Sequence, residues 1–275
     1  TDIMNKHHNP TAMLALLTSI VFVISLFGPS IASATPAVDP LDSKNWPGIS
    51  DAYLGNAPVI FDSNISLLLP QKIENSHDVP LTVMVSRSLG QVKELVVLAE
   101  DNPIQQVARL YLHRPIHSVS FKIRLETSTA VRAAALTSDG VWHVGSRLAL
   151  VSSPGGCSTP GAIGAGGNAK LGEIALKRYA RDGVYKNDRL KFRIIHPMDT
   201  GFVLNEEGES VPAYYIDRIS IHDQTGLLVE FDTQAAMSTD PIVTIDVPEL
   251  QQNIRVTAQD SKGLRFEAEE QTIMK

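Results

Sequence analysis

The chain contains a single cysteine, Cys157, among 275 residues. One cysteine excludes an intramolecular disulfide framework and any zinc or iron–sulfur site built from several cysteines. Positive charge is also in short supply, since 24 Lys and Arg stand against 30 Asp and Glu and the net charge is −6. This balance argues against a nucleic-acid-binding protein, because such proteins usually present a basic face.

Aromatic residues make up only 6% of the chain, and long apolar runs are absent after its first 34 residues. Hydrophobic residues nevertheless reach 43%, which is enough to build a folded core. Val, Ile and Thr are frequent, and these β-branched residues favour strands over helices. The composition therefore predicts a globular protein rich in β-strands.

Residues 1–34 contain the three parts of a secretory signal peptide. Lys6 supplies positive charge, Ala12 to Gly28 form an apolar run, and Ala32-Ser33-Ala34 is a small-x-small cleavage site. A membrane anchor is the alternative, but the run is short for a span and polar residues interrupt it. We expect cleavage after Ala34 and export to the periplasm of a chain that keeps no membrane contact.

Short runs of alternating apolar and polar residues predict strands on both sides of a glycine-rich break. The pattern is clearest in Ser118–Leu125, where every second residue is apolar. In the first half we expect strands at Val59–Asp62, Leu81–Ser86, Glu94–Ala99, Val107–Leu112, Ser118–Leu125, Val131–Thr137 and Val141–Leu150. In the second half we expect them at Leu190–Ile195, Tyr214–Ile221, Leu227–Asp232, Ile242–Val247, Asn253–Asp260 and Arg265–Thr272.

This spacing predicts an all-β protein of two β-sandwiches, each with its own core. Phe121, Ile123 and Leu125 should face the first core, and Leu190, Phe192 and Ile194 the second. Between the halves, residues 154–167 are too rich in glycine and proline for a regular element. Lys170–Ala180 is predicted as a short connecting helix because its apolar residues fall roughly on one helical face. The predicted domains are residues 50–152 and 183–275, with a glycine-rich cysteine arm and linker helix at 153–182.

Cys157 is the strongest candidate for chemistry. It follows Gly155 and Gly156 and precedes Ser158, and it lies outside any apolar run. Such flanks predict a solvent-exposed thiol, and no Lys, Arg or His nearby in sequence would lower its pKa from about 8.5. An unactivated, exposed thiol suits an acceptor that partner enzymes modify.

Other patterns carry little chemical information. Gly164–Ala169 fits a loose dinucleotide-binding pattern, but no strand precedes it, so we expect no cofactor. His113 and His117 have no third ligand beside them and are interpreted as edge-strand histidines, not as a metal site. His143 and His222 are isolated. No nucleophile elbow is present, so we assign no catalytic residue.

Several segments match a known family when they are taken together and in order. The first half resembles SoxY, a subunit of the thiosulfate-oxidising Sox carrier, and the second half resembles SoxZ. The SoxY-like segments are Leu69–Asn75 with Val79-Pro80, Ala99–Pro103, Phe121–Leu125, Thr137–Gly140 with Trp142, and Gly155-Gly156-Cys157. The SoxZ-like segments are His196–Gly201, Pro212–Ile216 and Met237–Pro241. The fused order resembles SoxYZ-like carriers associated with quinoprotein (pyrroloquinoline-quinone) dehydrogenases.

The resemblance implies two immunoglobulin-like sandwiches that pair with each other and a carrier without a catalytic centre. Cys157 would attach a covalent, sulfur-linked cargo on a swinging arm, and Gly155 and Gly156 would form the hinge. The implied partners are periplasmic enzymes, either Sox-type enzymes or a PQQ-dependent dehydrogenase. In SoxY the arm ends the chain, whereas here the second half follows Cys157, so the arm is tethered at both ends.

Two other functions remain open from the sequence. The chain could be a non-covalent adaptor that docks a periplasmic dehydrogenase, with Cys157 incidental. It could also be a thiol-dependent enzyme, although no general base lies near Cys157 in sequence. Replacement of Cys157 by serine separates a carrier from an adaptor.

Overall fold

The structure is a computed structural model that describes residues 38–160, 170–181 and 187–270. The predicted signal peptide at 1–34 and the second half of the glycine-rich stretch, residues 161–167, lie outside the described residues. The fold is all-β, as predicted, with one α-helix, α1 (Trp46–Leu54), and one 3₁₀ turn, η1 (Arg87–Leu89). The first-half strands are β1 (Val59–Phe61), β2 (Ile65–Leu68), β3 (Lys72–Ile73), β4 (Val79–Val85), β5 (Val92–Ala99), β6 (Gln106–Leu112), β7 (Ser118–Ile123), β8 (Thr129–Thr137) and β9 (Trp142–Val151). The later strands are β10 (Ile174–Arg181), β11 (Asn187–Ile194), β12 (Ile216–Asp223), β13 (Gly226–Thr233), β14 (Ile242–Pro248), β15 (Arg255–Asp260) and β16 (Arg265–Glu269).

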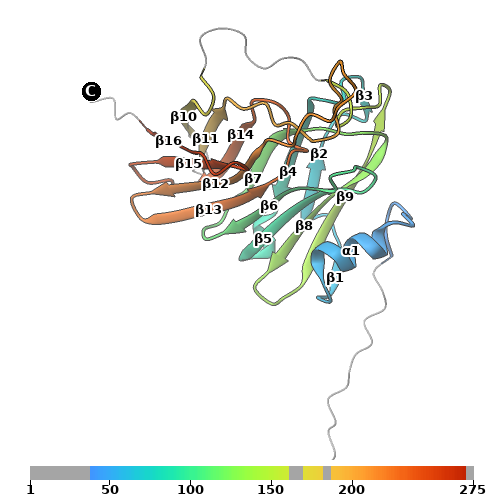
Figure 1. Ribbon diagram of the computed structural model, residues 1–275. Helices are drawn as coiled ribbons and strands as arrows, with labels where there is room; N and C mark the ends of the chain where they lie inside the picture. Colours follow the sequence, from blue (N-terminus) through green and yellow to red (C-terminus); the bar gives the residue numbers. More distant parts are fainter. Residues whose placement is uncertain (1–37, 161–169, 182–186, 271–275) are drawn as a thin grey trace, which may run out of the picture. The chain divides into compact units, whose positions relative to one another are not determined.

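The strands form a large and a small sheet (Figure 1). The large sheet has the order β1-β9-β8-β5-β6-β13-β12-β15-β16, and β3 also pairs with β9. The small sheet has the order β10-β11-β14-β7-β4-β2. Pairing is antiparallel except that β1 and β3 each run parallel to β9.

Both sheets continue from the first half of the chain into the second. In the large sheet β13 pairs with β6, with Phe231 opposite Leu110. In the small sheet β14 pairs with β7, with Ile245 opposite Val119. The two halves are therefore joined by backbone hydrogen bonds at two strand edges that would otherwise be open.

The core is continuous across this junction. The residues predicted to face inward are buried, namely Phe121, Ile123, Leu125, Leu190, Phe192 and Ile194. All six belong to one contiguous cluster of buried side chains, so the prediction of two separate cores is wrong. Strand pairing between the halves places their inner faces side by side in this one cluster.

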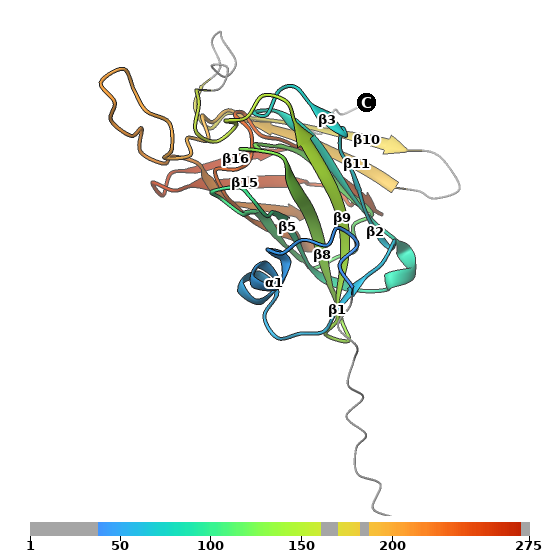
Figure 2. The ribbon, with the colours of Figure 1, turned by 90° about the vertical axis from the view of Figure 1, so that its right-hand side faces the viewer.

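Helix α1 covers the outer face of the large sheet, where the sequence analysis expected no helix (Figure 2). Pro47 lies in its first turn, where proline is tolerated. Trp46, Ile49 and Leu54 pack on Val96 and Leu98 of β5, which explains why β5 reads as a continuous apolar run: both of its faces are buried.

A buried arginine ties the segment before α1 to the sheet. Arg132 of β8 is fully buried and donates to both carboxylate oxygens of Asp39 at 2.6 and 2.8 Å. Its Nε donates to Glu100 at 2.6 Å, and its guanidinium lies 4.9 Å from the centre of the Trp46 ring. Two carboxylates and an aromatic face satisfy the charge that burial would otherwise leave unpaired.

The predicted connecting helix at 170–180 is wrong, because this segment contains β10. Alternate residues from Ile174 to Tyr179 are half-buried and exposed, which is the period of a strand. Residues Ile174–Arg181 pair with β11 over its whole length. The segment forms a strand although its residues favour a helix, because β11 offers an edge whose hydrogen bonds this segment satisfies.

His113 and His117 lie in the loop between β6 and β7 and not on an edge strand. Within the described residues, no cluster of three or more His, Cys, Asp or Glu side chains has a metal-binding arrangement. His143 bonds through Nδ1 to Asp62 at 2.5 Å.

In the same described part of the chain, no helix is long and apolar enough to span a bilayer.

Candidate functional site

Cys157 lies in the segment 152–160, which follows β9 and folds back onto the sandwich. We call it the cysteine segment. The residue is free of any disulfide and 0% exposed, so the prediction of a solvent-exposed thiol is wrong. Gly155 donates to the carbonyl of Glu126 at 2.8 Å and Gly156 to that of Leu125 at 3.2 Å. These bonds fix the backbone immediately before the cysteine.

The local geometry favours glycine at positions 155 and 156, for reasons other than flexibility. Gly155 has a φ of +106°, which residues with a side chain rarely adopt. A Cβ atom on Gly156 would lie 2.3 Å from the carbonyl oxygen of Ser76 and 2.5 Å from that of Leu125. Gly155 therefore permits the turn of the backbone before Cys157, and Gly156 lets the cysteine segment approach the sandwich closely. A hinge role for Gly155 and Gly156 stays a prediction.

The carboxylate of Glu126 holds the turn that contains the cysteine. It accepts hydrogen bonds from the backbone N–H of Cys157 at 3.0 Å and of Ser158 at 3.1 Å. The Ser158 hydroxyl donates to its other oxygen at 2.6 Å. Hydrogen bonds to an ionised carboxylate are among the stronger ones in proteins. Thr159 closes the turn by donating from its backbone N–H to Gly155 at 2.9 Å.

The second half of the chain also holds Cys157. The Thr200 hydroxyl donates to the Cys157 carbonyl at 2.6 Å. Arg124, which directly follows β7, donates to Gly156 O at 3.4 Å and also reaches the second half, with Thr239 Oγ1 at 2.8 Å. We call Arg124, Glu126 and Thr200 the cysteine seat.

Arg124 places a buried positive charge beside the thiol. It is 5% exposed, and all its hydrogen bonds go to neutral oxygens. Among the described residues no carboxylate lies within ion-pair distance of it. Burial lowers the pKa of Arg124, and the charges of Cys157, Asp78 and Asp199 act in the opposite direction.

The seat keeps the thiol protonated. Burial, and to a smaller extent the charge of Glu126, raise the pKa of Cys157 to about 12, although the charge of Arg124 acts to lower it. The thiolate is the reactive form of cysteine, so the seated residue is a poor nucleophile at neutral pH. Chemistry at this sulfur requires the cysteine segment to leave the seat.

The loop that carries Thr200 is itself anchored by a buried histidine. Backbone N–H of His196 donates to Asp240 at 2.9 Å, and backbone N–H of Met198 donates to His196 Nδ1 at 3.2 Å. The ring proton of the neutral histidine is therefore on Nε2, which is buried, has no hydrogen-bond partner and lies 3.8 Å from Asp260 Oδ2. Burial lowers the pKa of His196 to about 4, although Asp260 acts to raise it.

Sequence reasoning found Cys157 but missed the groups around it. Arg124, Glu126 and Thr200 are distant from Cys157 in sequence. The family resemblance could have pointed to two of these groups. Arg124 belongs to the segment Phe121–Leu125 and Thr200 to His196–Gly201, and both segments carry the resemblance. A third such segment, Ala99–Pro103, supplies Asn102, whose amide donates to Arg124 O at 2.7 Å and accepts from Glu126 N at 2.9 Å.

The convergence of these segments on one cysteine agrees with the family comparison. The family model of "Sulfur oxidation protein SoxY" matches residues 50–157 and that of "Sulphur oxidation protein SoxZ" matches residues 180–271. Together the matched ranges cover most of the chain. The protein is a SoxYZ-like fusion. The SoxY match ends at Cys157, the residue that the seat encloses.

Two solved structures are similar to parts of this fusion. The SoxY from Chlorobium limicola f thiosulfatophilum, described as a sulfur carrier protein, has 20% identity, covers 40% of this chain and 97% of its own, and gives a TM-score of 0.35. A putative membrane anchored protein from Corynebacterium diphtheriae has 9% identity, covers 76% of this chain and 57% of its own, and gives 0.22. Both TM-scores lie below the level at which two folds are regarded as the same. No curated protein matches the sequence significantly.

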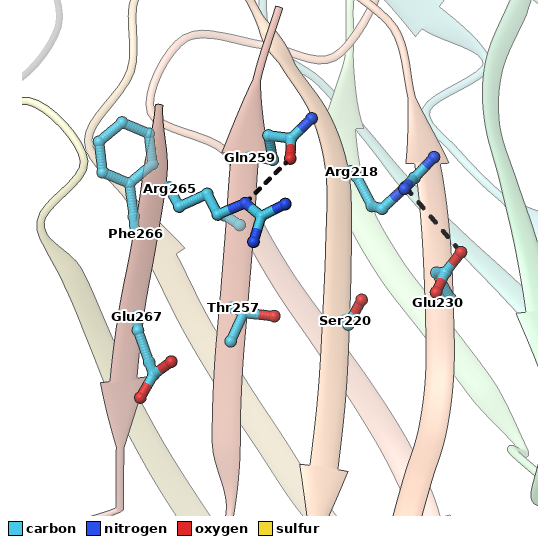
Figure 3. Close-up of a pocket in the computed structure, with 9 residues that line it drawn as sticks. Arg218, Ser220, Glu230, Thr257, Gln259, Arg265, Phe266 and Glu267 are labelled. Atoms are coloured by element: carbon cyan, nitrogen blue, oxygen red, sulfur yellow. Dashed lines mark hydrogen bonds and ion pairs between the residues drawn. The ribbon is translucent and has the colours of Figure 1, made fainter. Parts of the chain in front are cut away.

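The fusion also has a surface hollow far from any assigned chemistry. It has a volume of about 520 Å³ and lies on the solvent face of the strands β13, β12, β15 and β16 (Figure 3). Its polar side chains contact one another, with Arg218 Nε 3.9 Å from the carboxylate of Glu230 and Arg265 Nε donating to the neutral amide oxygen of Gln259 at 3.3 Å. This mutual compensation is typical of a solvated sheet face.

Proposed function

We propose that this SoxYZ-like fusion is a carrier without a catalytic centre of its own, which bears a sulfur-linked covalent cargo on Cys157 and presents it to partner enzymes. The observation that carries the proposal is the placement of Cys157. It is the only cysteine, it ends the SoxY match, and both halves of the chain contribute hydrogen bonds to its segment. The similar SoxY structure is described as that of a sulfur carrier.

In this proposal the carrier alternates between a closed and an open state. In the closed state Glu126 and Thr200 hold the cysteine segment, and the thiol, with its pKa raised to about 12, is protected. In the open state the thiol meets water and its pKa returns toward about 8.5. Cys157 then loses its proton, and its sulfur forms a bond to the sulfur of the cargo while an electron acceptor of the loading enzyme takes up the two electrons released. A partner enzyme later cleaves the cargo by reaction with water, which takes up the released group.

A second candidate is a non-covalent adaptor that docks a periplasmic dehydrogenase. The complete burial of Cys157 and its raised pKa favour this function, because an incidental cysteine is often an inert core residue. The two functions differ in their need for sulfur at position 157.

Replacement of the sulfur by oxygen separates the two functions. Cells that depend on the fusion are supplied with Cys157→Ser, and oxidation of a reduced sulfur compound and of the dehydrogenase substrate are both measured. A carrier loses the first activity completely, whereas an adaptor keeps its activity. Ser153→Ala is the matched control, since it alters an exposed residue of the same segment and leaves the thiol in place.

Export to the periplasm and the identity of the partners also belong to the proposal. Lys6, the apolar run from Ala12 to Gly28 and the site at Ala32–Ala34 support cleavage and export. The partners would be Sox-type enzymes or a PQQ-dependent dehydrogenase. Amino-terminal sequencing of the protein from a periplasmic extract tests export, and the expected mature chain begins at Thr35.

A further inference from the structure

A hairpin projects from the sandwich between β11 and β12 (the orange loop beyond the strand ends in Figure 2). We call residues 201–213 the projecting hairpin. Leu204 bridges Ser210, and Val211 N–H donates to Val203 at 2.8 Å. At its tip Asn205 Oδ1 accepts the N–H groups of Glu207 and Glu209 at 3.1 and 2.8 Å. These bonds give the hairpin a defined conformation.

One side of the projecting hairpin is apolar and faces solvent. Phe202 is 46% exposed and Leu204 is 59% exposed. They are two residues apart in the hairpin arm that the Leu204–Ser210 bridge defines, and this spacing places side chains on the same side of an extended backbone. The register that pairs Leu204 with Ser210 places exposed Pro212 opposite Phe202. Adjacent exposed apolar side chains on a projecting element are typical of a protein interaction site.

The tip of the hairpin carries negative charge. Glu206, Glu207 and Glu209 are exposed, and among the described residues none of them forms an ion pair with Lys or Arg. A concentrated negative charge of this kind selects partners with positive potential at the matching position.

The base of the hairpin touches the cysteine seat. Thr200, which holds the Cys157 carbonyl, immediately precedes Gly201. The Ser210 hydroxyl donates to Gly201 O at 2.5 Å and braces this base. A protein bound to the hairpin would therefore lie next to the cysteine segment.

We propose that the projecting hairpin is the docking element for a partner protein whose apolar groove, rimmed by Lys and Arg, receives Phe202 and Leu204 while its basic rim meets the three glutamates. The proposal rests on the proposed function in one respect: docking here places the partner's reactive site beside Cys157. The hollow of Figure 3 is a weaker candidate for this role, because Arg218 is paired with Glu230 and Arg265 donates to Gln259 within the sheet.

The experiment uses the full chain in the organism that produces it. A photoreactive phenylalanine analogue replaces Phe202 or, as a matched control, Leu264, which is 49% exposed in a different turn. Cross-linked partners are identified by mass spectrometry, which also maps the attached peptide. A charge-reversed version carries Glu206→Lys, Glu207→Lys and Glu209→Lys, and a control version carries Glu230→Lys and Glu267→Lys in the hollow.

We expect one identified partner at position 202, attached through a peptide next to Lys or Arg, and no adduct at position 264. Charge reversal at the tip should lower the adduct yield at least tenfold, and reversal in the hollow should leave it unchanged. Absence of the adduct at position 202, or an equal yield after charge reversal at the tip, overturns the docking proposal.

Cargo on Cys157 is measured in the same samples. A loaded Cys157 without a hairpin adduct overturns docking and leaves the carrier function intact. A hairpin adduct in a chain whose Cys157 is never loaded supports docking and contradicts the carrier function.

Discussion

Thr200 in the second half of the chain donates a 2.6 Å hydrogen bond to the carbonyl oxygen of Cys157 at the end of the first half. The environment of the thiol therefore depends on both halves. In a chain that joins them, this seat forms without a bimolecular encounter. The fusion thus makes the closed state of Cys157 a property of a single polypeptide.

Glu126→Gln should open the cysteine segment. The variant loses the charge that accepts three hydrogen bonds from Cys157 and Ser158, and bonds to charged groups contribute about 1.5–3 kcal/mol each. Because about 1.4 kcal/mol corresponds to a factor of ten, labelling of Cys157 by an aromatic disulfide reagent should accelerate at least tenfold. Glu230→Gln, on a distant strand, is the control. Equal labelling of both variants would show that Glu126 does not hold the segment.

Gly156→Ala tests the close approach of the backbone. The added Cβ would meet the carbonyl oxygens of Ser76 and Leu125 at 2.3 and 2.5 Å, so the cysteine segment has to shift outward. We expect faster labelling of Cys157 and little loss of global stability. Gly48→Ala adds the same methyl group in α1 with no atom within 4 Å and should leave labelling unchanged. A Gly156→Ala variant that labels at the wild-type rate contradicts the seat geometry.

His196 should make the protein less stable in mild acid. Its pKa is lowered to about 4 in the folded state, against about 6.5 in an unfolded chain. The unfolded state therefore binds the proton first, and stability falls as the pH drops from about 6.5 to about 4, by at most about 3 kcal/mol. His196→Asn, which keeps an acceptor for Met198 N–H, should flatten this decline in urea titrations. His113→Asn is the control, and identical slopes in the wild type and the His196 variant would exclude the effect.

Phe192→Ala tests whether the two halves share one core. Phe192 is 1% exposed, and truncation of such a ring costs about 3–5 kcal/mol. Both tryptophans, Trp46 and Trp142, lie in the first half and are buried. In a shared core, their fluorescence should report the whole destabilisation in urea. A tryptophan transition that does not move would mean that the halves unfold separately, and a loss below about 1 kcal/mol would place Phe192 at the surface.

Local alternation was sufficient to locate most strands. The strands predicted at Ser118–Leu125 and Val131–Thr137 correspond to β7 and β8, and their apolar residues identified them because one or both faces of these strands are buried. The same approach failed for β10, whose residues also fit a helical face and whose strand conformation depends on the free edge of β11. Helix α1 was missed because its apolar residues become informative only once the outer face of β5 is known.

The candidate site, like the fold, was only partly predictable from the sequence. Cys157 was found because its neighbours in sequence are unusual, whereas its burial depends on Glu126, Arg124 and Thr200, which only the fold brings to it. Glycine flanks are compatible with both a mobile arm and a tightly packed turn. The close approach of Gly156 to Ser76 distinguishes the two, and no single sequence reveals that distance.

The central claim is that Cys157 carries cargo. Its most direct test is the intact mass of the protein purified from the periplasm of cells oxidising a reduced sulfur compound. The account predicts a fraction of molecules with added mass that maps to the peptide containing Cys157, is removed by a thiol reductant and is absent from Cys157→Ser. A wild-type protein that always has the unmodified mass, under conditions in which the pathway is active, would contradict it.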